Sequence, residues 1–309
     1  MLKLITKQNI EKGALAGIFL IKSKTLKIPI AVNYDLTWQC NLRCKHCYFY
    51  ASAENLGKSS LKHRKELSDE LWIKIFKYHR NLGIQSVALT GGEPTLRMNL
   101  LHEAVKIFPA VQIASNGIIK LPCFKSRKQP IYWVSLDGSE ETHNSIRGAK
   151  IFHKVIENIQ NDKRVIISTT VTSMNYNEIN KIVKISYEAG VSGLFFLWYT
   201  GYPNDPLLLK GEILKKAAKD ILKVMKDYGD FILFSKKMLE LYITKEFISD
   251  CPFKSNRVVS FYPNGQKKFC VMGNSPDLCA NCSCIVPVAS YALSKFDIET
   301  IDKLSKFPF

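Results

Sequence analysis

The sequence has few acidic side chains and no long hydrophobic run. Its 309 residues include 44 Lys and Arg against 27 Asp and Glu, which gives a formal net charge of +17. The longest early apolar run, residues 14–21, is too short to cross a bilayer as a helix. The N-terminal residues also lack the ordered charged, apolar and small-residue regions of a secretory signal. These absences argue against a membrane-spanning or secreted protein, and we expect a cytoplasmic one.

The excess of basic residues does not by itself identify a partner. Positive charge favours anionic lipid headgroups, nucleic acid and acidic substrates alike, and a solvated surface of the thermophilic kind explains it equally well. We do not expect nucleic acid, because the chain contains no RNA-binding motif. Residues 1–26 place Lys on both sides of an apolar patch, which predicts a short amphipathic helix. Such a helix either lies on an anionic membrane surface or packs across the opening of the fold.

Six apolar runs alternate with helical patterns. The runs span residues 29–36, 86–90, 111–115, 131–137, 165–172 and 194–198. Their nearly continuous hydrophobicity is typical of strands buried on both faces of a parallel sheet. Helices are expected from the cap at Ser68 to Gly83 and over residues 98–108, 150–161, 176–189 and 211–228. Six units are too few for a closed eightfold barrel. The predicted fold class is therefore α/β, a partial (β/α)6 TIM barrel with its chemistry at the carboxyl ends of the strands.

The pattern changes from about residue 231. Helical periodicity fades, Pro, Gly and Asn become more frequent, and five cysteines lie within 34 residues. The turn 263–265 separates an apolar run from a short strand that ends in Cys270, which predicts a hairpin. Because this part has few apolar residues for a core, we interpret it as a small domain folded around a metal site. The predicted organisation is an amphipathic segment 1–26, a barrel core 27–230 and a C-terminal iron–sulfur domain 231–309.

Three further cysteines follow the first expected strand. Cys40, Cys44 and Cys47 have three and then two residues between them. Clustered cysteines in a cytosolic chain bind metal or take part in catalysis more often than they form disulfides. Thiolates at this spacing on a tight loop can bind three corners of an iron–sulfur cubane. A zinc site would need a fourth protein ligand, and the ring of the nearby His46 is expected to point away. Three ligands leave one iron open to an exogenous ligand.

The CX3CX2C loop with Tyr48 after it resembles the radical S-adenosylmethionine (radical SAM) superfamily over roughly residues 27–205. The resemblance implies an enzyme with a [4Fe–4S] cluster on the three cysteines, S-adenosylmethionine (SAM) at the fourth iron, and Tyr48 among the cofactor-binding residues. It also implies a flavodoxin- or ferredoxin-like one-electron donor. Reductive cleavage of SAM would give a 5′-deoxyadenosyl radical that abstracts hydrogen from the substrate.

Further motifs at strand ends match the same superfamily. Gly91, Gly92 and Glu93 match the element that binds the methionine amine, where glycines let the backbone pass close to a ligand. Polar groups on the next two strand ends hold the ribose and carboxylate of SAM in the family. The resemblance assigns this role to Ser115, Asn116, Ser135, Asp137 and Arg147. Thr170 and Thr172 on the fifth strand are additional candidates.

The C-terminal cysteines look like the auxiliary-cluster regions called SPASM or twitch domains. A full SPASM domain needs more cysteines, so the resemblance implies one auxiliary [4Fe–4S] cluster, with a structural zinc knuckle as the alternative. The expected ligands are Cys251, Cys270, Cys279 and Cys282, with Cys284 as a close substitute. The remaining cysteine, Cys123, is expected to be a buried apolar residue.

The resemblance also bears on the substrate. Auxiliary-cluster domains of this type are commonest in enzymes that modify peptides, so a peptide or protein is the expected substrate. The alternative is a membrane lipid or another hydrophobic metabolite, which the Lys-flanked apolar segment at residues 1–26 favours.

Overall fold

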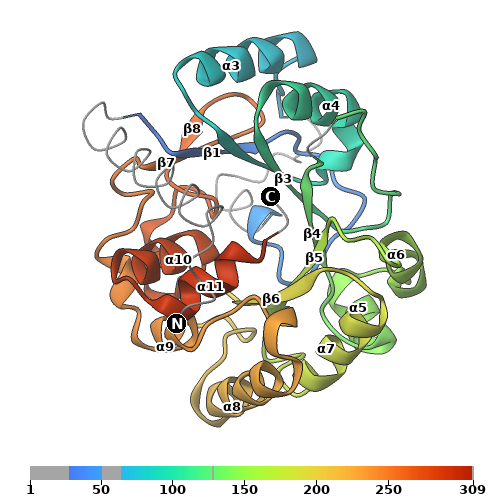
Figure 1. Cartoon of the computed structure of the whole chain (residues 1–309), viewed down its shortest axis with the longest axis vertical. Coiled ribbons are helices and arrows are strands. Elements are labelled where there is room, and N and C mark those ends of the chain that lie inside the picture. Colours follow the sequence, from blue (N-terminus) through green and yellow to red (C-terminus); the bar gives the residue numbers. More distant parts are fainter. Residues whose placement is uncertain (1–27, 51–63, 127–128, 308–309) are drawn as a thin grey trace.

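The computed structural model describes residues 28–50, 64–126 and 129–307, so the expected helix within residues 1–26 lies outside the described part. Its centre is one eight-stranded sheet with the order β6-β5-β4-β3-β2-β1-β7-β8 (Figure 1). The strands are β1 (Ala31–Asp35), β2 (Ser86–Thr90), β3 (Ala110–Ser115), β4 (Ile131–Ser135), β5 (Val165–Val171), β6 (Gly193–Trp198), β7 (Val258–Phe261) and β8 (Lys267–Lys268).

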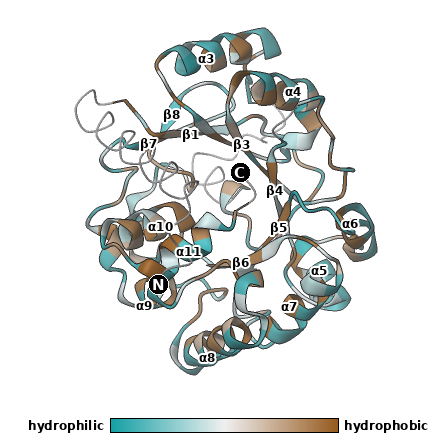
Figure 2. Cartoon of the chain, in the orientation of Figure 1, coloured by the Kyte–Doolittle hydropathy of each residue, from teal (hydrophilic) through white to brown (hydrophobic). Residues whose placement is uncertain are grey.

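The first six strands form the predicted partial barrel. They pair in parallel in chain order, and helices from the intervening segments surround the curved sheet (Figure 1). These helices are α3 (Asp69–Asn81), η3 (Pro94–Arg97), α4 (Met98–Ile107), α5 (Glu140–Arg147), α6 (Phe152–Ile159), α7 (Ile179–Glu188) and α8 (Gly211–Tyr228). The strand residues are mainly apolar and lie between the helices and the barrel interior (Figure 2). The fold-class prediction is confirmed.

Helix α3 illustrates how local signals position the barrel. Its N-cap residue Ser68 accepts a hydrogen bond from the Leu71 backbone N–H at 3.4 Å, as the sequence predicts. The buried face of α3 carries Trp72 and Phe76, whose rings lie 5.5 and 5.0 Å from that of Tyr34 on β1. This aromatic packing fixes β1 and, with it, the start of the cysteine loop.

Residues 231–307 complete the sheet and fill the gap between its two edges. Strand β7 pairs in parallel with β1 and continues through a turn into the antiparallel strand β8, so the predicted hairpin is present. On the other edge, Tyr242 of α9 donates a hydrogen bond to the Phe196 carbonyl of β6 at 3.2 Å. Figure 1 shows the C-terminal helices between these edges. The elements are η4 (Gly229–Phe231), α9 (Lys236–Thr244), η5 (Glu246–Ile248), η6 (Pro276–Asn281), α10 (Ile285–Ser294) and α11 (Ile298–Ser305).

Two expectations about this chain are wrong. The C-terminal part is not poor in apolar core residues: Phe234, Tyr242 and Phe247 are fully buried and belong to the same core cluster as the barrel. Its apolar residues are spread over short elements that bury against the barrel, so no long periodic stretch marks them in the sequence. Cys123 is exposed rather than buried, because it lies in the irregular segment between β3 and β4.

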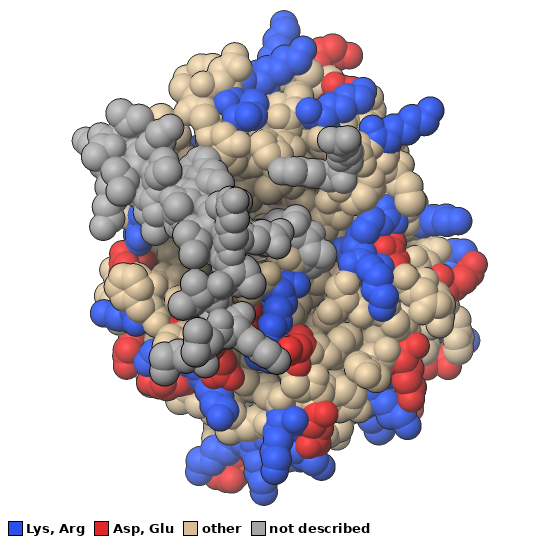
Figure 3. Space-filling model, in the orientation of Figure 1, with Lys and Arg blue, Asp and Glu red and all other residues tan. Residues whose placement is uncertain are grey.

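The described residues contain no membrane-spanning helix, and the face in view carries no continuous basic stripe. Among the described residues, no helix is both long and apolar enough to cross a membrane. Figure 3 shows Lys and Arg scattered over the visible face, with Asp and Glu between them. On that face the excess positive charge is dispersed, as on a solvated surface.

Candidate active site

The loop with Cys40 is held by the backbone of the glycine motif. The Gly92 N–H donates to the Thr37 carbonyl and the Glu93 N–H to the Gln39 carbonyl, both at 2.8 Å. A Cβ on Gly92 would lie 2.0 Å from the Gln39 oxygen. The glycines therefore let the backbone that follows β2 pass close to the backbone of Gln39, one residue before Cys40.

The three thiols of the loop are half-buried and receive N–H donors. The Leu42 N–H points at Cys40 Sγ at 3.4 Å, and Arg147 Nη1 lies 3.7 Å from Cys44 Sγ. The backbone N–H groups of Tyr50 and Phe49 donate hydrogen bonds to the sulfur of Cys47. Burial raises the pKa of Cys40 to about 11, and the Leu42 N–H acts against that effect because it stabilises the Cys40 thiolate. Three thiols with N–H donors fit the ligand set of an iron–sulfur cluster.

A buried carboxylate holds two side chains, Arg147 and His46, beside this loop. Asp137 is fully buried just after β4, and its Oδ2 lies 2.5 Å from Arg147 Nε and 3.0 Å from His46 Nε2. Burial alone would raise the pKa of Asp137, but Arg147 and His46 outweigh it and hold that pKa well below its usual range. Asp137 is therefore ionised. It contacts Nε2 of His46, which holds the ring in place, and it directs the Arg147 guanidinium towards Cys44.

Glu93 joins the ends of β2 and β3. It is 1% exposed, and its Oε1 accepts hydrogen bonds from the Thr95 N–H and hydroxyl at 3.1 and 2.7 Å. The Ser115 hydroxyl donates to the same oxygen at 3.0 Å, and the Asn116 N–H donates to Oε2 at 2.8 Å. Burial raises the pKa of Glu93, whereas these donors lower it. The structure thus gathers three of the expected site residues into one bonded group.

Asn116 connects the hydrogen-bonded group around Glu93 to the cysteine loop. Its Nδ2 donates to Asn41 Oδ1 at 2.7 Å and lies 4.0 Å from Cys40 Sγ. Among the other expected residues, Tyr48 hydrogen-bonds to Thr90 at the end of β2. Thr172 instead closes a local turn, with its hydroxyl 3.2 Å from Asn175 Oδ1.

Ser135 and Thr170 are half-buried at or near the carboxyl ends of β4 and β5. The Thr170 backbone N–H donates to Asp137 Oδ1 at 3.3 Å. Both residues therefore lie at the strand edge that carries the cysteine loop.

Several residues that shape the site were missed from the sequence. Asn33 and Asp35 are polar residues at alternate positions of the first apolar strand, so they lie on the same face of it. This alternation could have identified them as site residues. Thr90 donates to Asp35 Oδ1 at 2.7 Å, and the buried Lys268 of β8 forms an ion pair with Asp35 Oδ2. A polar network thus joins β1, β2 and the C-terminal hairpin inside the barrel. No local sequence pattern indicates that Lys268 pairs with Asp35.

The cysteine loop has a second anchor that the sequence does not reveal. Glu66 Oε1 accepts hydrogen bonds from the Thr37 hydroxyl at 2.8 Å and the Trp38 N–H at 2.6 Å. Arg97 Nη1 donates to Glu66 Oε2 at 2.9 Å and thereby ties the anchor to η3. Each partner is distant in sequence, so spacing alone could not have paired them.

The five C-terminal cysteines are all half-buried. Burial raises the pKa of Cys270 to about 11, and Cys279 and Cys251 add to the increase. Burial also raises the pKa of Cys282 to about 12, with contributions from Cys270 and Cys251. Cys284 interacts electrostatically with Cys282, Cys270 and Cys251 in the same way.

These thiols are therefore close enough to influence one another's ionisation, and an all-thiol donor set suits an iron–sulfur cluster or zinc. Within the described ranges, no three His, Cys, Asp or Glu side chains are arranged to hold a single metal ion.

The sequence comparisons agree with this geometry. Residues 35–184 match the radical SAM superfamily. The antilisterial bacteriocin subtilosin biosynthesis protein AlbA of Bacillus subtilis is 28% identical over 255 residues, which are 77% of this chain and 52% of that protein. The mycofactocin maturase MftC of Mycobacterium tuberculosis is 28% identical over 180 residues, 54% of this chain and 44% of that protein. The chain thus spans about half the length of these curated relatives, or less.

Two solved structures share the fold. The structure of anSMEcpe with bound AdoMet is 19% identical, covers 91% of this chain and 85% of that chain, and gives a TM-score of 0.62. Streptococcus suis SuiB bound to its precursor peptide SuiA is 16% identical, covers 85% and 65%, and gives a TM-score of 0.59. At these identities the likeness concerns the fold alone.

A partial barrel with three thiols on the loop after its first strand defines a class of iron–sulfur proteins. Because the matched segment begins at the end of β1 and includes the loop and the glycine motif, the chain belongs to the radical SAM superfamily of enzymes.

Proposed function

We propose that this protein reductively cleaves SAM and uses the resulting 5′-deoxyadenosyl radical to abstract hydrogen from a peptide or protein. The observation that carries the proposal is the half-buried loop of Cys40, Cys44 and Cys47, whose sulfurs receive N–H donors. When bound there, a [4Fe–4S] cluster would supply the electron that cleaves SAM, delivered by a flavodoxin- or ferredoxin-like donor.

The residues around the loop have complementary tasks in this proposal. Asp137 orients Arg147 so that its guanidinium donates to Cys44 Sγ, which favours a fixed loop geometry. The backbone of Gly92 and Glu93 clamps the segment that leads to Cys40. The amide of Asn116 and the ring of Tyr48 would then line the space where SAM binds, beside Cys40 and Cys47.

Glu93 would support the SAM site. Its four hydrogen bonds come from Thr95, Ser115 and Asn116, so its carboxylate already serves as a support. An ammonium group of SAM could share these oxygens or bind the nearby backbone. In both cases Glu93 fixes the strand ends that form the cofactor site.

An auxiliary [4Fe–4S] cluster on the C-terminal cysteines is the second part of the proposal. Cys251, Cys270, Cys279 and Cys282 are the proposed ligands, and Cys284 is the substitute for Cys282. Cys284 also interacts electrostatically with Tyr48, so the C-terminal thiols extend towards the cysteine loop of the barrel. This proximity supports a role as an electron acceptor or substrate anchor. The proposed domain boundary near residue 230 stays a prediction.

The similarity to peptide maturases favours a peptide substrate. AlbA takes part in the biosynthesis of a bacteriocin, MftC is a maturase, and SuiB was crystallised with a precursor peptide. The chain is similar in sequence to AlbA and MftC and in fold to SuiB, and the C-terminal cysteines are present. The alternative, a lipid or another hydrophobic metabolite, depends on residues 1–26, which lie outside the described part of the chain.

The decisive experiment compares cells with and without the gene under anaerobic conditions. Peptides and lipids are extracted from both and compared without preselection by mass spectrometry. The proposal predicts a peptide whose mass or fragmentation changes only when the gene and the three loop cysteines are intact. A change confined to lipids would favour the alternative substrate class and reject the peptide assignment.

A further inference from the structure

The last C-terminal cysteines lie on a segment that hydrogen bonds hold against the barrel. The Ser283 N–H donates to the Thr200 hydroxyl at 3.0 Å, and Asn281 Nδ2 donates to the Gly201 carbonyl at the same distance. Both acceptors follow β6, so the segment lies at the carboxyl end of that strand. Ser283 is 2% exposed, and Cys282 packs against the core. The fold therefore sets the surroundings of the Cys282 sulfur.

Lys245 reaches this segment from the end of α9. Its Nζ donates to the Cys282 carbonyl at 2.8 Å and to the Ser283 hydroxyl at 3.1 Å. An ammonium group has three N–H donors, so one remains for a further acceptor. Burial raises the pKa of the Cys282 thiol, and the charge of Lys245 is among the effects that lower it. The side chain thus places a positive charge beside a proposed cluster ligand.

The backbone of Lys245 is strained. This residue ends α9 in the left-handed conformation, with φ 60° and ψ 15°, which usually belongs to glycine at a helix end. A positive charge near a helix C-terminus is favourable, but it does not have to come from the strained residue. The helix alone therefore does not explain why a lysine stands here, and the strain directs attention to its side chain.

Lys245 is also a half-buried cation without a carboxylate partner. Within the described ranges no Asp or Glu pairs with it, and the Cys282 sulfur is the one titratable group that acts on it. Burial lowers the pKa of Lys245 to about 8, and the Cys282 sulfur acts in the opposite direction. Cations taken out of water are normally paired with an anion, because their desolvation is costly. The ammonium lacks such a counter-charge until an anionic group binds beside Cys282.

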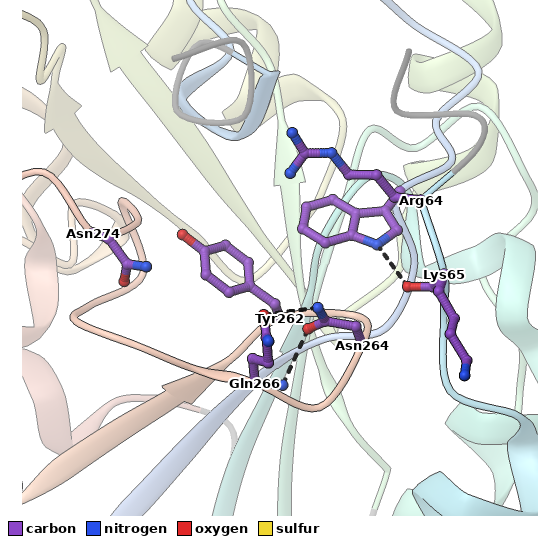
Figure 4. A pocket seen from close by; sticks show the side chains of 7 residues that line it. Arg64, Lys65, Tyr262, Asn264, Gln266 and Asn274 are labelled. Carbon is purple, nitrogen blue, oxygen red and sulfur yellow. Dashed lines mark hydrogen bonds between the residues drawn. The ribbon is translucent and has the colours of Figure 1, made fainter. Parts of the chain in front are cut away.

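Two other buried cations near the cysteines are compensated. Arg147, beside the barrel loop, is paired with Asp137. Lys268 of β8 acts on the Cys270 thiol and is paired with Asp35. Figure 4 shows the β7–β8 hairpin that carries this second pair, together with a pocket of about 250 Å³ at its turn. Lys245 differs from both cations, since no carboxylate of the described residues neutralises it.

We propose that Lys245 is a positioning residue of the auxiliary site, whose ammonium is the counter-charge of the [4Fe–4S] cluster and favours its reduced form. The inference rests on the proposed function, because it requires a cluster on the C-terminal cysteines. A cluster held by thiolates is an anion, and an added electron makes it more negative. A nearby ammonium therefore stabilises the reduced form more than the oxidised form. This charge suits the role of electron acceptor, rather than that of substrate anchor.

The test is a redox titration of the full-length protein, prepared anaerobically with its clusters and followed by electron paramagnetic resonance at pH 7. The auxiliary signal is identified by its loss in Cys270→Ser. At the wild-type midpoint potential, Lys245→Met should lower the ratio of reduced to oxidised auxiliary cluster about tenfold, or about 59 mV for one electron. Lys245→Gly should have the same effect, although it relieves the strained end of α9. Lys245→Arg keeps the charge and should stay close to the wild-type ratio.

Two controls show whether the effect is local. Lys236→Met removes the same charge from an exposed position at the beginning of α9, roughly 13 Å away along the helix. Because salt screens charges at this separation, the ratio should not change. The barrel cluster is the control within the same molecule, and its midpoint potential should be the same in every Lys245 variant.

An unchanged ratio in Lys245→Met and Lys245→Gly would overturn the inference. An equal shift in Lys236→Met, or in the barrel cluster, would also reject it, because the effect would not be local. If both neutral variants lose the auxiliary iron and Lys245→Arg keeps it, the counter-charge is supported through assembly of the cluster. Loss of that iron from Lys245→Arg as well would assign the residue a packing role and contradict the proposal.

Iron content separates failure of this inference from failure of the proposed function. Wild-type protein with about eight irons per chain and no shift in the Lys245 variants would reject the role of Lys245 alone. Wild-type protein with about four irons would reject the auxiliary cluster and, with it, this inference. Cleavage of SAM at the barrel loop would be unaffected in both cases.

Discussion

The two cysteine-rich regions of the molecule are built in different ways. The thiols of Cys40, Cys44 and Cys47 lie on one loop, which the ends of β2, β3 and β4 hold through Glu93, Asn116 and Asp137. The C-terminal thiols are spread over residues 251–284, mostly in loops, and among them Cys282 packs against the barrel core. We therefore expect the first site to depend mainly on its contacts with the barrel and the second more on its own ligands.

The largest effect is expected from replacing Cys40, Cys44 and Cys47 together with Ala. Iron and sulfide should each fall by about four per chain, because a [4Fe–4S] cluster loses its ligands. The auxiliary cluster should survive, since its proposed ligands lie on other elements. Iron quantitation and electron paramagnetic resonance check this. Loss of all iron would show that the two sites depend on each other.

Gly92→Ala should damage the first site without touching a thiol. Its Cβ would lie 2.0 Å from the Gln39 carbonyl oxygen, so the segment before Cys40 has to move. We expect loss of most of the barrel cluster and an intact C-terminal site. The matched control is Gly211→Ala, where a Cβ meets no atom within 4 Å and only the positive φ of +51° is strained. Equal iron loss in both variants would contradict the clamp.

Cys270→Ser should halve the iron content and leave the barrel cluster in place. Since residues 231–307 share the barrel core, the domain should remain folded and lose order mainly around the cysteines. Limited proteolysis checks this difference: cleavage should concentrate within residues 251–284. Cleavage throughout the segment 231–309 would mean that metal ligation, rather than apolar packing, supplies most of its folding energy.

The ion pair between Lys268 and Asp35 connects the two regions directly. Both side chains are almost fully buried, at 1% and 0% exposure. Removing one partner of a buried pair leaves an uncompensated charge and costs about 3–5 kcal/mol. Asp35→Asn should therefore lower the single unfolding transition of the whole chain in thermal denaturation. Addition of Lys268→Met should recover part of the loss, and an additive double variant would argue against the pairing.

The smallest expected effect is that of Glu93→Gln. The Gln amide NH₂ would face donors on Thr95, Ser115 or Asn116, which costs about 1–3 kcal/mol. SAM affinity should fall roughly tenfold to hundredfold while the cluster stays bound. Equilibrium binding of SAM and iron content are measured on the same preparation. Unchanged affinity with normal stability would reduce the motif to an ordinary turn.

The barrel could be predicted because its signals are local. Each apolar run became a strand of β1 to β6, since buried parallel strands need continuous hydrophobicity. The spacing of Cys40, Cys44 and Cys47 similarly marks a loop on its own. Helix α5 was missed because its eight residues are mostly polar and its buried face is short.

The partners across the sheet could not be predicted in the same way. The sequence indicates a hairpin at residues 258–270 but not that β7 pairs with β1 or that Lys268 reaches Asp35. Likewise, the glycine motif is visible, while its close contact with the backbone of Gln39 is not. Such contacts join residues far apart in sequence, so they follow from the folded topology rather than from spacing.

One measurement tests the central claim most directly. The reconstituted wild-type protein is incubated anaerobically with SAM and dithionite, and 5′-deoxyadenosine and methionine are quantified by mass spectrometry. The account predicts both products from the wild-type protein and from Cys270→Ser, and neither from the variant with Ala at Cys40, Cys44 and Cys47. Wild-type levels of 5′-deoxyadenosine from that triple variant would contradict the assignment of the cysteine loop as the site of SAM cleavage.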